Sequence, residues 1–412
     1  MKIKLTITVS LLLLCLPVGG CVPAQSFDGQ LKPIVKPHTF DMVSWEFETL
    51  IDDMKQLVLS KNEQVEDESN KTAEYFSVVE RIITLRYETA AVNVGHRQSD
   101  PAALEAELKV LEEQRTALED VVERTIKKQI KEMLAEQGIY NPIDNYTRSK
   151  VSFPPLNFKL EKPPCLLVIS PRDRIESIRE VLIQQDASLE EKEAIEAEVD
   201  ELGVSSLVVE LGGLSGVYPN FVTDEASPRF TIDTATEEWL HQYLFFKPLG
   251  FLYFLDAAGV SRNYEIATIN ETVASMVSKE IGSIVYKKYY STDESSDNQD
   301  QAATSGFDFN REMREIRRTV DIYLAEGEIE QAEEFMELER QYLVSNGYYI
   351  RKLNQAYFAF YGTYADSPTS ISPIGVELKE LRSKSASLKD FLDTVAIMTN
   401  RQDLLLALDK SQ

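Results

Sequence analysis

The chain has 412 residues, of which 68 are acidic and 43 basic, so its formal net charge is -25. This charge argues against binding to nucleic acid and against adsorption to anionic lipid, because the field of the protein repels both. The length is sufficient for two or three structural units that bury apolar cores of their own.

The N-terminus predicts export. Lys2 and Lys4 precede an apolar run over residues 5–16 that is too short for a permanent membrane-spanning helix. The segment Val18-Gly19-Gly20-Cys21 then resembles a bacterial lipobox. This resemblance implies that Cys21 is lipidated, becomes the first residue of the mature protein and anchors it to the cell membrane or cell envelope. The alternative is an ordinary signal peptide followed by an unrelated cysteine.

A helical region is expected between the N-terminal segment and the middle of the chain. Asp100 and Pro101 form a helix-start signal, and the helix is expected to end near Gly138. Arg115 interrupts its apolar face, which favours a helical hairpin over a long coiled coil. That face is made by leucine and valine at positions 104, 108, 111, 118 and 122.

Two short apolar runs, over residues 165–170 and 206–211, predict strands. The charged segment over residues 172–202 between them is predicted to be helical. After the second run there are glycines at positions 212, 213 and 216. Glycines here allow a turn or let the backbone of a ligand come close, and both interpretations stay open.

Two further segments of the chain carry an apolar pattern. Residues 243–255 are interrupted by Lys247, Pro248 and Gly250, so they are predicted to be buried core or the wall of a pocket and not a membrane span. Residues 387–408 are predicted to form one amphipathic helix at the end of the chain.

The most informative motif has two parts. The run Thr236-Glu237-Glu238-Trp239-Leu240-His241 is followed, after 28 intervening residues, by Asn270-Glu271-Thr272-Val273-Ala274. Residues four apart on a helix share a face, so Glu237 and His241 can point at one ion with Glu238 beside them. An H-E-x-x-H motif places two metal ligands and a general base in this way.

Together, the two runs resemble the zinc-binding helices of gluzincin metallopeptidases. With Leu353-Asn354-Gln355-Ala356 and Gly362-Thr363-Tyr364 downstream, their order is similar to a bacterial aminopeptidase-like family of gluzincins over residues 205–380. The resemblance implies a peptide or protein substrate and a zinc ion held by Glu237, His241 and Glu271. It further implies that Glu238 is the general base and that Tyr364 stabilises the oxyanion.

Glu237 departs from the family pattern because it stands where the first histidine of the motif is expected. A carboxylate can bind zinc, but a second anionic ligand makes a zinc-bound water less acidic. Zinc binding with reduced activity and complete loss of the site both stay open. Each glutamate also fits a capping box, as Thr234-x-x-Glu237 and Thr268-x-x-Glu271, in which it would cap its own helix and bind no metal.

The predicted fold is α+β and mostly helical, with a gluzincin-like core, a small sheet and a helical N-terminal region. Its predicted parts are a signal peptide (1–20), a tether (21–40), a helical region (41–150), a metallopeptidase-like α/β part (151–290), a mobile loop (291–310) and a C-terminal helical part (311–412). The predicted function is a membrane-anchored zinc metallopeptidase-like protein that hydrolyses peptides, and reduced or lost activity stays open. The alternative is a non-catalytic helical interaction lipoprotein of the cell envelope. Convergence of Glu237, His241 and Glu271 would favour the first.

Overall fold

The computed structural model describes residues 26–42, 44–46, 49, 68–93, 100–144, 149–290 and 307–410. Over these residues the fold is mostly helical with two three-stranded sheets, so the predicted α+β class is confirmed. No helix in these ranges is long and apolar enough to cross a membrane. The predicted signal peptide, Cys21 and most of the predicted loop over 291–310 lie outside the described residues.

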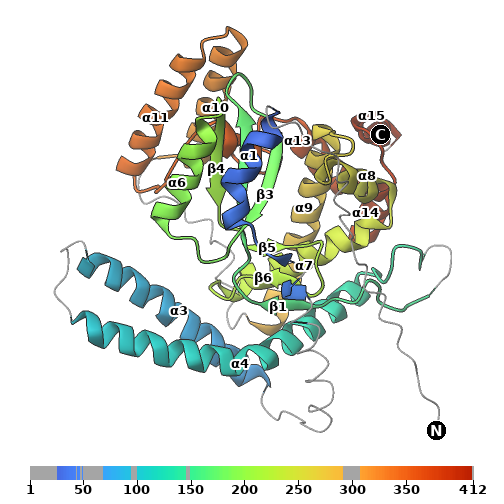
Figure 1. Cartoon of the computed structure of the whole chain (residues 1–412). Helices are drawn as coiled ribbons and strands as arrows, with labels where there is room; N and C mark the ends of the chain where they lie inside the picture. The colour runs from blue at the N-terminus through green and yellow to red at the C-terminus, as the bar shows by residue number, and fades with distance from the viewer. Residues whose placement is uncertain are drawn as a thin grey trace.

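The first sheet has β2 (Cys165–Pro171) between β3 (Arg179–Ile183) and β4 (Val204–Val209), and both pairings are antiparallel. Alternate side chains of a strand point to opposite faces, so the two faces of β2 have different partners. One face packs against α1 (Phe27–Val35) and α6 (Leu189–Asp200), and the other against α12 (Gln355–Tyr361). Figure 1 shows α1 and α6 in front of this sheet.

Two sequence predictions in this region were wrong. The described part of the predicted tether forms α1, because Ser26 caps the helix and Leu31 and Val35 are buried against the sheet. The segment over 172–202 contains β3 as well as α6. The strand β3 begins with the charged residues Arg179 and Glu180, so the sequence pattern does not indicate a strand. It is stabilised by its pairing with β2.

The second sheet is smaller. Its order is β1 (Phe158–Leu160), β6 (Asn220–Val222) and β5 (Gly213–Leu214), with β1 parallel and β5 antiparallel to β6. The two-residue strand β5 is therefore an edge strand. The chain turns between β5 and β6 through Gly216, whose φ of 87° favours glycine.

Three helices lie next to these sheets: α7 (Pro228–Phe245), α8 (Pro248–Ala257) and α9 (Tyr264–Tyr289). Ser227 caps α7 and Asn263 caps α9 through their side-chain oxygens. The two helices come close because Ala274 is small and fully buried, and because a Cβ atom at Gly282 would collide with Asp233. Side chains on two rigid, adjacent helices can therefore meet at one point.

Helices α3 (Glu68–Asn93) and α4 (Pro101–Glu136) form a long hairpin that extends from the rest of the molecule (Figure 1). Asp100 caps α4 and Gly138 follows its end with a φ of 74°, so the predicted bounds are confirmed. Arg115, which interrupts the apolar face, forms an ion pair of 2.7 Å with Asp224 after β6. The predicted hairpin is thus fixed to the small sheet.

The C-terminal part contains α10 (Phe309–Ala325), α11 (Ile329–Ser345), α13 (Ile374–Lys384), α14 (Leu388–Ala396) and α15 (Arg401–Lys410). The prediction of one helix over 387–408 was wrong. The helix is interrupted after α14. Thr399 donates its backbone N–H and its hydroxyl to Asp403, at 2.8 and 2.9 Å, and these hydrogen bonds stabilise the start of a new helix. Apolar residues of α13, α14 and α15 share one core with α4, α7 and α9.

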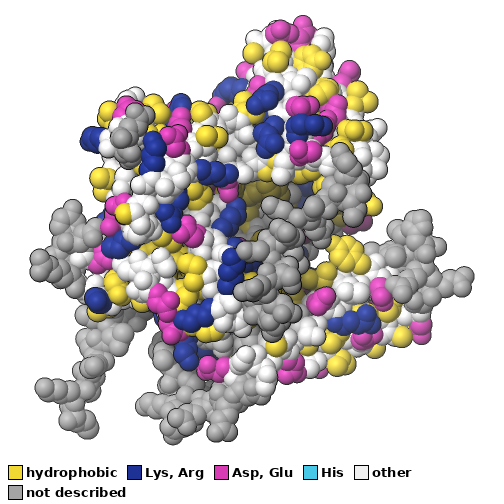
Figure 2. All heavy atoms as spheres, turned by 180° about the vertical axis from the view of Figure 1, so that it is seen from behind, with side chains coloured by type: hydrophobic (Ala, Val, Ile, Leu, Met, Phe, Trp, Pro, Cys, Tyr) yellow, Lys and Arg dark blue, Asp and Glu magenta, His cyan; other side chains and the backbone are white. Residues whose placement is uncertain are grey.

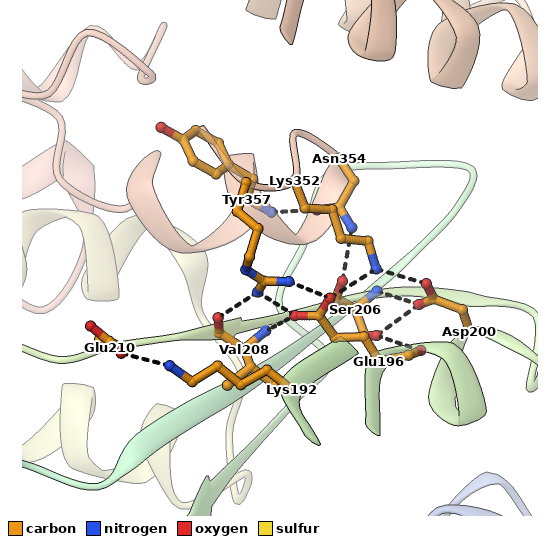
Figure 3. Close-up of polar contacts among 10 residues, drawn as sticks. Lys192, Glu196, Asp200, Ser206, Val208, Glu210, Lys352, Asn354 and Tyr357 are labelled. Carbon is orange, nitrogen blue, oxygen red and sulfur yellow. Dashed lines mark hydrogen bonds and ion pairs between the residues drawn. The ribbon is translucent and has the colours of Figure 1, made fainter. Parts of the chain in front are cut away.

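A buried ionic network fastens the segment before α12 to β4 (Figure 3). The carboxylate of Glu196, only 2% exposed, accepts hydrogen bonds from the Val208 backbone at 2.7 Å and from Arg351 at 2.9 Å. Asn354 donates to the Ser206 carbonyl at 2.8 Å while its Oδ1 caps α12. Paired in this way, the buried charges hold α12 and the segment that follows it in a fixed place.

The surface charge is mixed. On the face in Figure 2, acidic and basic side chains are interspersed over the surface. Many acidic and basic side chains of the described residues form ion pairs between elements, such as Arg382 with Glu280 at 2.7 Å and Arg401 with Glu377 at 2.5 Å. The net charge is thus not collected into one acidic region on this face.

Candidate metal centre

Three potential ligands converge between α7 and α9. Glu237 and His241 come from α7 and Glu271 from α9, and one ligand atom of each lies within 4.8 Å of the others. Among the described residues, no other group of three histidine, cysteine or acidic side chains converges in this way. We call Glu237, His241 and Glu271 the metal group.

The ring of His241 is oriented by the neighbouring helix. Its Nδ1 atom lies 2.9 Å from Oδ1 of Asn270, which is fully buried on α9. With the amide oxygen facing the ring, Nδ1 donates its proton and Nε2 keeps its lone pair. Nε2 lies 3.5 Å from Oε2 of Glu271. The nitrogen available to a metal therefore faces the second ligand.

The two carboxylate oxygens of Glu271 have different surroundings. Oε1 accepts a short hydrogen bond from the hydroxyl of Tyr253 on α8. Oε2 is buried and has no hydrogen-bond partner. A buried carboxylate oxygen without a donor is costly unless a cation compensates it. The two carboxylate oxygens thus fit an arrangement in which Tyr253 holds one and a metal ion takes the other.

Glu237 lies in an acidic environment. Burial above all, together with Glu271, Asp366 and Asp233, raises its pKa to about 8 against the opposing effect of Lys279. Without a cation, the carboxyl group is therefore largely protonated at neutral pH. A divalent cation favours the ionised form of a neighbouring acid, so metal binding at this position would release a proton.

Glu238, the next residue of α7, points toward β5. A Cβ atom at Gly213 would collide with its carboxyl group, so this glycine is needed for the close approach. Burial raises the pKa of Glu238 well above its usual range, as do Glu237 and Glu271, whereas hydrogen bonds with Ser215 lower it. Glu238 can therefore hold a proton beside the metal group.

Tyr364, which follows α12, lies near the metal group although it is distant from α7 and α9 in the sequence. The next residue, Ala365, donates its backbone N–H to Thr272 on α9 at 2.9 Å. Burial raises the pKa of Tyr364 well above its usual range, and the nearby Glu271 and Glu237 raise it further, so the phenol stays protonated. It can donate a hydrogen bond to a developing negative charge.

The capping alternative for the two glutamates was wrong. α7 begins at Pro228 and α9 at Tyr264, with Ser227 and Asn263 as their caps. Thr234 and Thr268 lie inside the helices, one or more turns after these starts. Thr268 donates to the Tyr264 carbonyl at 2.8 Å, as a threonine in a helix does. Neither glutamate caps its helix.

A cavity of about 830 Å³ opens beside the metal group. Glu238, His241, Glu271 and Tyr364 line it, whereas Glu237 does not. The cavity is also lined by β5 and the following turn, together with Glu180 of β3 and part of β2. A volume of about 300–1,000 Å³ is usual for a small ligand or a short piece of chain.

The sequence-predicted site residues 237, 238, 241, 271 and 364 thus meet in one region, while Cys21 lies outside the described residues. Sequence reasoning missed the contacts of Tyr253 and Ser215. Neither residue has a local signal, because each reaches the site only through packing between distant segments. Asn270 was part of the motif, but its contact with His241 could not be read from spacing.

No protein-family model, no curated protein and no solved structure matches this chain. The resemblance to gluzincins rests on the motifs quoted from the sequence, and the geometry stands as independent support for a metal site. The donors are two carboxylates and one imidazole, a set that suits a divalent zinc ion.

Proposed function

We propose that this protein is a zinc-binding metallopeptidase with a gluzincin-type core that is attached to the membrane by a lipid and hydrolyses peptides. The observation that carries the proposal is the convergence of Glu237, His241 and Glu271 within 4.8 Å beside a cavity of about 830 Å³. Three protein ligands leave one coordination position for water or substrate, as catalytic zinc requires.

Zinc, when bound, would polarise a substrate carbonyl and lower the pKa of a water molecule. The chain's own residues supply the remaining functions. The carboxyl group of Glu238 lines the cavity next to the metal group, and its ionised form would be favoured beside a bound cation. This carboxylate would accept the proton of the attacking water and return it to the leaving amine. Tyr364 donates a hydrogen bond to the oxyanion from the other side.

The activity is proposed to be weak. Glu237 supplies negative charge where the related family has a neutral imidazole. Two anionic ligands reduce the Lewis acidity of the ion and leave its water less acidic. We therefore expect slower hydrolysis than in a site with two histidines and one glutamate.

The α3–α4 hairpin supports the second candidate, a non-catalytic interaction lipoprotein. The hairpin extends from the molecule (Figure 1), and it exposes 75% of Tyr87 and 62% of Val110. Surfaces of this kind can bind a protein partner. The convergence of the metal group favours the peptidase, because an interaction protein has no need for these three side chains to meet.

The test is hydrolysis by the purified chain with added zinc. A mixture of unstructured peptides would be incubated with wild type, with Glu238→Gln and with Glu265→Gln, and the products identified by mass spectrometry. Glu265 is a matched control because it is an exposed glutamate on α9. We expect products with wild type and Glu265→Gln only, and none after chelation. Equal product formation by Glu238→Gln would contradict the proposal.

A further inference from the structure

Five phenylalanines beside the cavity form a connected cluster. The ring centroids are 5.1 Å apart for Phe153 and Phe246, 5.3 Å for Phe245 and Phe246, and 5.3 Å for Phe245 and Phe254. Phe251 joins the cluster through Phe245 at 6.3 Å. Phe153, Phe245, Phe246 and Phe254 line the cavity, whereas Phe251 does not. We call these four cavity-lining rings the aromatic wall.

The aromatic wall is not core packing. Phe246 is 39% exposed and Phe153 is 40% exposed, although each has another ring of the cluster beside it. A single exposed apolar side chain needs no explanation, but contiguous rings in a concave surface are typical of a binding site. The rings also offer no hydrogen-bonding group, so a charged side chain placed against them would lose most of its hydration.

The aromatic wall lies in line with the metal group. Phe245 is four residues after His241 on α7, so the two side chains share a face of the helix and are separated by about 6 Å along its axis. An extended peptide advances about 3.3 Å per residue. A peptide bond held at the metal group therefore brings a side chain one or two residues away to the wall.

We propose that the aromatic wall is a specificity pocket for a bulky apolar side chain, such as phenylalanine, leucine or methionine, of a peptide bound beside the metal group. The pocket determines which peptides bind and where they lie relative to the metal group. For its role in hydrolysis this inference rests on the proposed function. The proposed binding preference depends only on the aromatic wall and does not require hydrolysis.

The test measures binding to the full chain by fluorescence anisotropy. The probes are labelled pentapeptides with blocked ends that differ only at the central residue: phenylalanine, leucine, alanine or lysine. Phe246→Ser and Phe251→Ser are the matched variants, because the two residues are exposed to a similar extent, 39% and 49%, and belong to one cluster, but only Phe246 lines the cavity. Each protein is measured with added zinc and with a chelator.

Wild type is expected to bind the phenylalanine and leucine peptides about 10-fold more tightly than the alanine and lysine peptides. Phe246→Ser should lose most of this preference, and Phe251→Ser should keep it. Equal affinity for all four peptides, or an equal loss in both variants, would overturn the inference. A preference without any hydrolysis in the presence of added zinc would overturn only the peptidase proposal. Hydrolysis without a preference would overturn only the pocket.

Discussion

The Nδ1 atom of His241 and the Oδ1 atom of Asn270 are 2.9 Å apart, and this contact joins α7 to α9 within the metal group. It directs Nε2 toward Oε2 of Glu271. Hydrogen bonds of this kind orient a ligating histidine and make it a better donor. Asn270 is therefore a positioning residue of the candidate metal centre.

Asn270→Ala is expected to weaken zinc binding by about 10- to 100-fold, because the ring of His241 loses the acceptor that fixes it. Asn270→Asp should retain most of the affinity, since a carboxylate oxygen accepts the same proton. Competition with a fluorescent chelator gives both dissociation constants. If Asn270→Ala is folded and binds zinc as tightly as wild type, the proposed positioning role is wrong.

Glu237→His is expected to increase both zinc affinity and activity. The substitution replaces an anionic ligand by a neutral imidazole and leaves Glu238 and Glu271 unchanged, so the zinc becomes a stronger Lewis acid. Rates of peptide hydrolysis and zinc dissociation constants would be compared with wild type. The gain in hydrolysis must disappear in the double variant Glu237→His, Glu238→Gln. A folded variant that gains neither property would show that the likeness to gluzincins does not extend to the site.

Glu119 on α4 is expected to make stability depend on pH. Burial above all, together with Asp224 and Glu123, raises its pKa to about 7 against the opposing effect of Arg115. Because the folded-state pKa lies above the unfolded value, the folded protein holds a proton that the unfolded chain has released. This carboxyl group therefore lowers the free energy of unfolding progressively as pH rises from about 4.5 to 7.

Glu119→Gln removes this dependence. We expect the variant to be more stable than wild type by about 1–2 kcal/mol at pH 8 and nearly equal to it at pH 5. Urea unfolding at both pH values measures the difference. A variant that is less stable than wild type at pH 8 would mean that the ion pair with Arg115 outweighs the cost of burying the charge.

Cys21→Ser should release the protein from the membrane. Lipidation requires the thiol, and the negative net charge of the chain gives it no other attraction to anionic lipid. Cells that express wild type or the variant would be fractionated and the fractions probed for the protein. An unchanged membrane-bound fraction would contradict the predicted anchor.

Part of the fold could be predicted because its signals are local. The apolar runs at β2 and β4 are short and β-branched, and α4 has a cap at Asp100 and a glycine at 138. The strand β3 could not be predicted, because its first residues are charged and it is stabilised by pairing with β2. Helix α1 is also stabilised mainly by distant residues, through the burial of Leu31 and Val35.

The same distinction holds for the site. Helical spacing places Glu237 and His241 on one face of α7, so their proximity follows from the sequence. The cavity does not follow from it, because its walls come from segments as distant as Phe153, Ser215 and Tyr364. The hydrogen bond from Tyr253 to Glu271 likewise depends on how α8 packs against α9.

The most direct test of the account is the zinc content of the purified chain, measured by elemental analysis after equilibration with limiting zinc. We expect about one zinc per chain for wild type and for Glu265→Gln, which removes an exposed carboxylate from the same helix as Glu271. Glu271→Gln and His241→Ala should each retain little or none. Equal zinc content in all four proteins would contradict the account, because the metal would then be bound elsewhere.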